Sequence, residues 1–282
     1  MMGEKTNGQR MEEYKLKAGV LGVYQFKFKY YEENDIVEVE EMIADSHGYI
    51  KIPPFVGRIS QFAWNVNCNE STIYIPKNCI IDFPESNYIM GISNYAKHIE
   101  VDAEHKKYIS IDGVLFSKDK TQLLAYPAYK EDVEYKIPSS VYSVEDYAFS
   151  YNHFLKKLSI AKKIVHIGQN RFKRETKFVV NKENEMYKSI HGSLYSKDGK
   201  TLYYMHGEQY NDIKVEEGTV LIKEQWEEGD YGTLYLPKSL KYIEKSYMLF
   251  DEYMVWFDEI MAPKEIKKQL KEYEKDFKIT YY

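Results

Sequence analysis

Apolar and polar residues alternate in short stretches of this chain, and a proline often ends the alternation. Ile50-Lys51-Ile52-Pro53 and Tyr135-Lys136-Ile137-Pro138 are the clearest examples, and similar openings recur at Ile73, Leu158 and Leu234. A period of two places the aliphatic side chains on one face of a strand. Proline then removes a backbone donor and ends the ladder. Each stretch therefore predicts a short strand with one buried face.

A second apolar pattern, with steps of three and four residues, follows the clearest of these strands. Val56, Ile59 and Ala63-Trp64 form it in one copy, and residues 141–149 repeat it at the same offsets. Steps of this length suit a helical or 3₁₀ turn that faces the same core as the strand. Because Ile52 and Ile75 are 23 residues apart, we expect one strand and one turn per repeat of that length.

A longer motif occurs twice, at positions 79 residues apart. YISIDGVLFSKDKTQLLAYP begins at Tyr108, and YKSIHGSLYSKDGKTLYYMH begins at Tyr187. In each copy two alternating stretches flank a turn, and Asp198-Gly199 is a strong hairpin signal. Lys120 stands in the first copy where the second has Gly199, so we expect a looser first turn. The order is then two coils and a hairpin, twice, followed by two coils and a cap.

The two motifs together resemble the BspA-type leucine-rich-repeat family. The resemblance is carried by IPSSVYSVEDYAF from Ile137, KLSIAKKIVHIG from Lys157 and SIDGVLFSKDKTQLLAYP from Ser110. It implies an α/β, β-dominated fold: a right-handed leucine-rich-repeat solenoid with inserted β-hairpins and terminal caps, whose coils hold 20 to 29 residues. Many members of the family are surface or secreted bacterial proteins, and the characterised ones act in adhesion and protein binding. The resemblance therefore implies recognition rather than catalysis.

The repeats divide the chain into a solenoid and two caps, which we place at 49–245, 1–48 and 246–282. The N-terminal cap is expected to be a β-hairpin, with strands at Val20–Tyr30 and Ile36–Glu40. In the C-terminal cap Pro263 suits the first turn of a helix, and residues 278–282 suit a last strand. A cap is needed at each end because the end coil of a solenoid otherwise exposes its apolar cross-section.

Composition and charge narrow the class of protein. Hydrophobic residues make up 44% of the 282 residues, which is enough for a core and excludes wholesale disorder. The net charge of -5 is spread along the chain without a block of Lys or Arg, which argues against a nucleic-acid partner. No run of about 18 apolar residues predicts a membrane-spanning helix.

The N-terminal sequence has no apolar stretch of signal-peptide length before Val20. This absence predicts a cytoplasmic protein. If an export signal precedes Met1, the expected location is instead the cell surface or the exterior.

The chain carries little that suggests catalysis. Cys68 and Cys79 are the only cysteines, too few for a disulfide-held scaffold or a zinc site built from thiolates; a single bridge between them stays open. No recognised nucleophile, zincin or nucleotide-binding motif is present. Asp112 and His191 occupy equivalent places before the hairpin glycines, and this exchange favours a turn role over a catalytic one. We predict no catalytic, cofactor-binding or metal-binding residue and no cofactor.

Metal-ligand types are densest at His98, Asp102, Glu104 and His105. Zinc accepts such a mixture of nitrogen and oxygen ligands. Residues 98–102 nevertheless alternate as a strand, and a charged strand edge explains them without a metal. A metal-dependent hydrolase that uses this region is therefore the alternative function.

Tyrosine is the compositional outlier, with 28 residues. Tyr favours strands and also serves as a contact residue at interfaces. The aromatic stretch 247–257 supplies our candidate partner-contact residues, Tyr247, Tyr253 and Trp256, although a final coil that buries alternate residues explains the stretch equally. We expect a non-enzymatic recognition module that binds a protein, favoured over a glycan, through the solenoid surface. A self-assembling structural protein is a further alternative.

Overall fold

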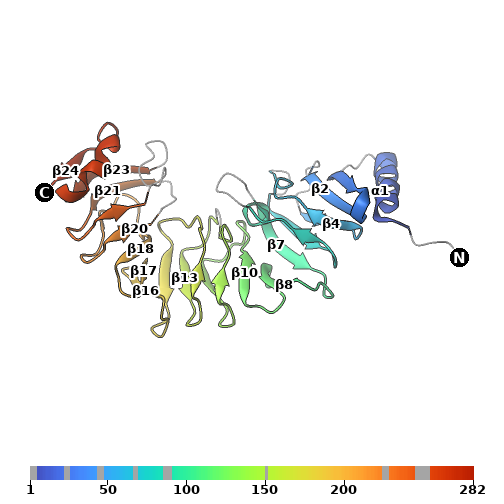
Figure 1. Cartoon of the computed structure of the whole chain (residues 1–282), viewed down its shortest axis with the longest axis horizontal. Helices are drawn as coiled ribbons and strands as arrows, with labels where there is room; N and C mark the ends of the chain where they lie inside the picture. Colours follow the sequence, from blue (N-terminus) through green and yellow to red (C-terminus); the bar gives the residue numbers. More distant parts are fainter. Residues whose placement is uncertain are drawn as a thin grey trace. The chain divides into compact units, whose positions relative to one another are not determined.

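The computed structural model describes residues 5–21, 26–42, 48–65, 69–84, 91–149, 152–223, 229–244 and 255–282. Short β-strands dominate these residues (Figure 1). The chain divides into two compact units, which we call unit 1 (Met1–Lys130 with Val144–Asn152) and unit 2 (Glu131–Ser143 with His153–Tyr282). The β-dominated repeat solenoid expected from the sequence is confirmed.

Unit 1 contains a parallel sheet to which each coil adds one strand. Its strands, in the order β3-β5-β7, are β3 (Tyr49–Lys51), β5 (Ser71–Ile75) and β7 (Ala96–Val101). Ile50 pairs with Ile73, and Ile73 pairs with Ile99 on the next strand. All three side chains are buried. The aliphatic positions of the alternating pattern thus form a ladder through the core.

The second half of each coil is also a strand, so the predicted helical or 3₁₀ turn is wrong. A turn in which Val56 N–H donates to Pro53 C=O leads into β4 (Val56–Ile59), which runs parallel to β2 (Ile36–Met42). Val37 pairs with Val56 and Glu38 with Arg58, so Gly57 is an extra residue in β4. Such a bulge turns a three-residue apolar step into a strand with both ends facing inward.

The same arrangement continues beside β4. The four-stranded sheet has the order β1-β2-β4-β6, with β1 (Phe26–Tyr31) antiparallel to β2, and β6 (Ile80–Ile81) parallel to β4. The inward positions Val56, Ile59, Ala63 and Trp64 are buried as predicted, and so are Val141, Val144, Ala148 and Phe149.

The 79-residue repeat forms a three-stranded antiparallel meander in each unit, one strand more than the predicted hairpin. Its strands are β8 (Tyr108–Ile111), β9 (Val114–Ser117) and β10 (Gln122–Ala125) in unit 1, and β16 (Tyr187–Ile190), β17 (Ser193–Ser196) and β18 (Thr201–Tyr204) in unit 2.

The expectation of a looser turn between β9 and β10 is wrong. Lys120 takes the left-handed conformation of Gly199, with φ of 63° against 82°. Both residues donate their N–H to a serine carbonyl three positions earlier at 2.8 Å. Asp119 closes its turn on Thr121 N–H just as Asp198 closes the other on Lys200 N–H. The side-chain hydrogen bond of the aspartate holds a non-glycine residue where glycine is favoured.

Unit 2 holds further parallel ladders. One has the order β11-β13-β15, and another has the order β19-β21-β23-β24. In the second, Leu234 pairs with Ile260, and Ile260 with Ile279. The strands are β11 (Glu134–Lys136), β13 (Lys157–Ile160), β15 (Lys177–Val180), β19 (Ile213–Lys214), β21 (Gly229–Tyr235), β23 (Val255–Ala262) and β24 (Ile279–Tyr281). The remaining short strands are β12 (Ser143–Val144), β14 (His166–Ile167), β20 (Leu221–Ile222) and β22 (Tyr242–Ile243).

The N-terminal segment differs from the predicted hairpin. Residues Asn7–Leu21 form helix α1, and β1 begins only at Phe26, so the strand expected from Val20 is wrong at its start. Thr6 and Gln9 form a capping box, in which each side chain bonds the other residue's N–H, and this signal marks the helix start. The hairpin of β1 and β2 forms through η1 (Glu32–Asn34) as predicted.

The C-terminal elements follow the prediction. η3 (Lys264–Ile266), α3 (Lys267–Leu270) and η4 (Lys271–Tyr273) continue from Pro263, and the last strand is β24. Ile266 and Leu270 are buried in the core of unit 2. A further short helix, α2 (Ile92–Tyr95), lies in unit 1. The boundaries 1–48, 49–245 and 246–282 remain a prediction.

Candidate functional site: an aromatic face and an acidic hollow

Trp256, one of the three predicted contact residues, lies in β23 with its side chain 47% exposed. Its ring centroid is 5.9 Å from that of Phe277, so one side of the indole is supported by the core. Tyr247 and Tyr253 lie outside the described residues. The structure therefore places one of the three candidates, and places it on the surface.

Other exposed tyrosines occur on the strands and loops around Trp256. Trp256 pairs with Asp230, whose C=O accepts the N–H of Tyr210, a residue 74% exposed. Tyr235 on β21 and Tyr282 after β24 are also exposed, at 39% and 41%. We call Tyr210, Tyr235, Trp256 and Tyr282 the aromatic face. Tyr and Trp at such positions supply large contact areas at low entropic cost.

Polar groups between the strands hold this region in place. Glu259 on β23 accepts hydrogen bonds from Thr280 Oγ1 and, at 3.0 Å, from Lys278 Nζ. These bonds, that of Thr280 first, lower the pKa of Glu259. Asp212 likewise accepts Thr233 N–H at 2.7 Å. Interstrand bonds of this kind fix the backbone on which the aromatic face is displayed.

A hollow of about 590 Å³ lies beside β19 in unit 2. Its lining includes Tyr195 from β17, the imidazoles of His191 and His206, and three carboxylates, those of Glu208, Asp212 and Glu216. The Nε2 of His191 is 3.4 Å from Glu216 Oε1. We call this concavity the acidic hollow. Sequence reasoning missed it, because the meander turn and residues 208–216 meet only through the folding of the chain.

A second polar and aromatic surface lies on the β3-β5-β7 sheet of unit 1. Tyr49 donates its hydroxyl to Glu100 at 2.9 Å, and Tyr74 donates to Asp102 at 2.7 Å. The hydrogen bond to Asp102 raises the pKa of Tyr74 to about 12, because loss of the proton would leave two negative oxygens in contact. Both tyrosines occupy the outward positions of the alternating pattern, so the alternation itself could have identified them.

The cluster from His98 to His105 does not assemble into a ligand set. His105 is buried: its Nδ1 accepts the N–H groups of Lys107 and Tyr108, and its Nε2 is 2.9 Å from Cys79 C=O. Both ring nitrogens are therefore engaged with the backbone. His98 lies against Gly113, where an added Cβ would come within 2.3 Å of Nδ1. Within the described residues no group of three or more His, Cys, Asp or Glu side chains is placed to hold a metal ion.

Asp112 and His191 are turn residues, as the sequence indicated. Both have positive φ, 50° and 48°, and each precedes a glycine with positive φ. Two-residue turns of this kind require left-handed backbone at both positions, which Asp and His adopt more readily than most residues.

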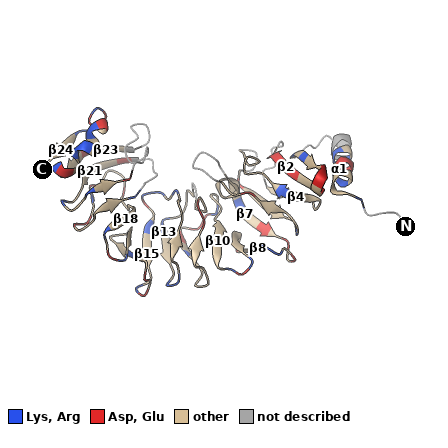
Figure 2. Ribbon diagram, viewed as in Figure 1, with Lys and Arg blue, Asp and Glu red and all other residues tan. Residues whose placement is uncertain are grey.

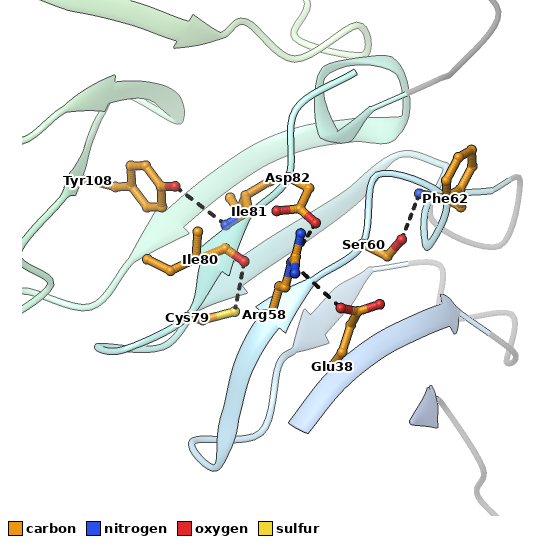
Figure 3. A network of polar contacts seen from close by, with 9 residues as sticks. All are labelled: Glu38, Arg58, Ser60, Phe62, Cys79, Ile80, Ile81, Asp82 and Tyr108. Atoms are coloured by element: carbon orange, nitrogen blue, oxygen red, sulfur yellow. Dashed lines mark hydrogen bonds and ion pairs between the residues drawn. The ribbon is translucent and has the colours of Figure 1, made fainter. Parts of the chain in front are cut away.

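A polar network ties the strands of unit 1 together (Figure 3). Arg58 Nε lies 2.7 Å from Asp82 Oδ2 and 3.6 Å from Glu38 Oε2. Burial raises the pKa of Glu38, and Arg58 acts in the opposite direction. These residues neutralise one another along the ladder of β2, β4 and β6. The network is accordingly structural.

Cys79 is a buried free cysteine beside this network, whereas Cys68 lies outside the described residues. Burial raises the pKa of the Cys79 thiol. Its Sγ is 3.8 Å from Ile80 C=O. The thiol is therefore neutral and enclosed.

Charges of both signs are interspersed over the described parts of both units (Figure 2). Among these residues, no helix is both long and apolar enough to cross a membrane.

The stacked coils define the class: the chain is a repeat protein of the leucine-rich-repeat type. No protein-family model and no curated protein matches it. Among solved structures, it is similar to a leucine-rich repeat protein from Eubacterium ventriosum, with 20% identity, a TM-score of 0.40, and coverage of 76% of this chain and 57% of that one. The match thus spans little more than half the length of that protein.

Two further solved structures are similar. One is the pneumococcal vaccine antigen PcpA, with 15% identity, a TM-score of 0.35, and coverage of 91% of this chain and 83% of that chain. The other is a leucine-rich cell surface protein from Faecalibacterium prausnitzii, with 13% identity, a TM-score of 0.34, and coverage of 91% and 93%.

Proposed function

We propose that this chain is a non-enzymatic, BspA-type recognition module that binds a protein partner through the aromatic face of unit 2. The observation that carries the proposal is the exposure of Tyr210, Tyr235, Trp256 and Tyr282 around a core that buries its aliphatic residues. The core does not require exposed aromatic rings at these positions. Tyr and Trp are enriched at the centres of protein interfaces, which favours a protein over a glycan.

The engaged ring nitrogens of His105 weigh against the alternative of a metal-dependent hydrolase. A hydrolytic metal site keeps three protein ligands and an open position. His105 is held by the backbone on both sides and is no longer available as such a ligand.

Affinity capture with the immobilised protein tests the proposal. Tyr210→Ala and Tyr235→Ala, combined in one variant, remove two exposed rings from the aromatic face. Tyr142→Ala is the matched control, because Tyr142 is 45% exposed elsewhere in unit 2. The expected result is a partner captured by the wild type and the control and lost from the double variant, with unchanged melting temperatures. Capture of the same partner by all three proteins contradicts the proposal.

A further inference from the structure

The acidic hollow carries more negative charge than the chain itself balances. Glu208, Asp212 and Glu216 line it together with one ammonium group, that of Lys214. In the described part of the chain Lys214 forms no ion pair with any of the three. The exposed imidazole of His191 lies near Glu216 alone. The lining therefore attracts a positive group from outside the chain.

Each carboxylate is oriented by a bond to one of its oxygens. Asn211 Nδ2 donates to Glu208 Oε2 at 3.3 Å, and Thr233 N–H donates to Asp212 Oδ1. No partner within the described residues engages the second oxygen of Glu208 or of Asp212. These oxygens remain acceptors, already positioned, for a donor that enters the hollow.

The imidazole of His206 adds a further acceptor. Its Nδ1 is 3.0 Å from Arg174 C=O, and because a carbonyl oxygen only accepts, Nδ1 carries the proton. In the neutral ring Nε2 then has a lone pair and no hydrogen. The hollow is thus lined by groups that accept hydrogen bonds, with Lys214 as the exception.

The first copy of the repeat shows a cation of the chain's own at the corresponding turn. Asp112, the equivalent of His191, forms an ion pair at 3.0 Å with Lys130, whose side chain is only 12% exposed. In the second copy Gln209 stands 79 residues after Lys130, so the sequence supplies no such cation. The turn that is occupied in unit 1 borders an open, acidic hollow in unit 2.

We propose that the acidic hollow binds the guanidinium group of an arginine side chain on the protein partner. A guanidinium carries five N–H donors and no acceptor, which complements a lining of acceptors. Its planar fork pairs with carboxylates in bidentate fashion, which the compact ammonium of lysine does not do. An anionic group would meet three carboxylates and is excluded by repulsion. This inference rests on the proposed recognition function and assigns one chemical feature of the partner.

Titration calorimetry with defined peptides tests the hollow without requiring the natural partner. The probes are blocked hexa-arginine, hexa-lysine and hexa-glutamate peptides. The hollow variant combines Glu208→Gln, Asp212→Asn and Glu216→Gln. The control variant combines Glu185→Gln, Glu265→Gln and Glu272→Gln, three exposed carboxylates of unit 2 outside the hollow, and changes the net charge equally.

The expected result is that hexa-arginine binds the wild type and the control alike, binds the hollow variant about tenfold more weakly or less, and exceeds hexa-lysine in affinity. Three results overturn the inference: no binding of hexa-arginine to the wild type, equal binding to the hollow and control variants, or no preference over hexa-lysine. Failure of the proposed function appears separately, as partner capture that does not depend on the aromatic face. Circular dichroism of each variant confirms that it is folded.

Discussion

His105 and Asn184 occupy the same place in the two copies of the repeat and make the same contacts with different chemistry. Each accepts the backbone N–H groups two and three residues later, His105 through Nδ1 at 3.1 and 3.0 Å and Asn184 through Oδ1 at 2.9 and 2.8 Å. Each also reaches a carbonyl of the preceding coil at 2.9 Å. Both side chains are buried. They fasten the start of each meander to the coil before it.

The first prediction follows from this equivalence. His105→Asn should change the free energy of unfolding by less than about 1 kcal/mol, because Asn reproduces both sets of hydrogen bonds in the other copy. His105→Ala should lower it by about 2–4 kcal/mol, since it leaves buried N–H and C=O groups unpaired and opens a cavity. Urea denaturation measures both changes. Equal losses in the two variants would show that the hydrogen bonds contribute nothing.

The second prediction concerns acid. Burial lowers the pKa of His105, so the unfolded chain takes up a proton that the folded chain refuses. Stability should therefore fall as the pH drops below about 6.5, the unfolded value, by at most about 1.4 kcal/mol per pH unit, until the lower folded pKa is passed. Urea midpoints of the wild type and His105→Asn at pH 7.5 and 5.5 check this. An undiminished acid loss in His105→Asn would contradict it.

The third prediction compares the two meander turns. Gly199→Ala places a side chain at φ of 82° and should lower the free energy of unfolding by about 1 kcal/mol. Lys120→Gly relieves the same strain in the first copy but frees the unfolded chain, so its net effect should lie within about 0.5 kcal/mol of zero. Thermal melting of both variants measures the difference. A destabilising Lys120→Gly as large as Gly199→Ala would refute the account of the turn.

The fourth prediction concerns Glu38 and Arg58. The folded pKa of Glu38 is raised, so its ionised form disfavours folding at neutral pH and the contribution turns favourable only as the pH falls through that pKa. Glu38→Gln should therefore cost less than about 0.5 kcal/mol at pH 7, while Arg58→Met should cost about 1–2 kcal/mol by leaving Glu38 and Asp82 unneutralised.

A double-mutant cycle supplies the control for this pair. Arg58→Met should cost less in the Glu38→Gln background than in the wild type, because one of the two stranded carboxylates is gone. Identical costs in both backgrounds would mean that Arg58 acts on Asp82 alone.

Local patterns predicted the inward face of the coils well, because alternation is a property of neighbouring residues. Ile50 and Ile73 are buried where the alternation placed them. The second strand of each coil could not be predicted in this way. A three-residue step indicates a helical turn unless a bulge intervenes, and the bulge at Gly57 exists only because β4 pairs with β2. Helix α1, in contrast, had a readable signal in the capping box of Thr6 and Gln9.

The candidate site was predictable only in part. Aromatic composition identified Trp256, and the alternation could have added Tyr235, since both depend on local sequence. The acidic hollow could not be predicted, because His191 and Asp212 belong to a meander turn and to a strand of a different sheet. Their proximity is a product of the fold, and no spacing in the sequence encodes it.

The buried thiol of Cys79 has a practical consequence for studying how the chain opens. Only a thiolate reacts with alkylating reagents, and the folded surroundings of Cys79 both enclose the sulfur and disfavour its ionisation. In a Cys68→Ser variant, alkylation of the folded protein must therefore wait for a fluctuation that exposes Cys79. The rate of labelling then measures how often unit 1 opens, with no foreign probe introduced into the chain.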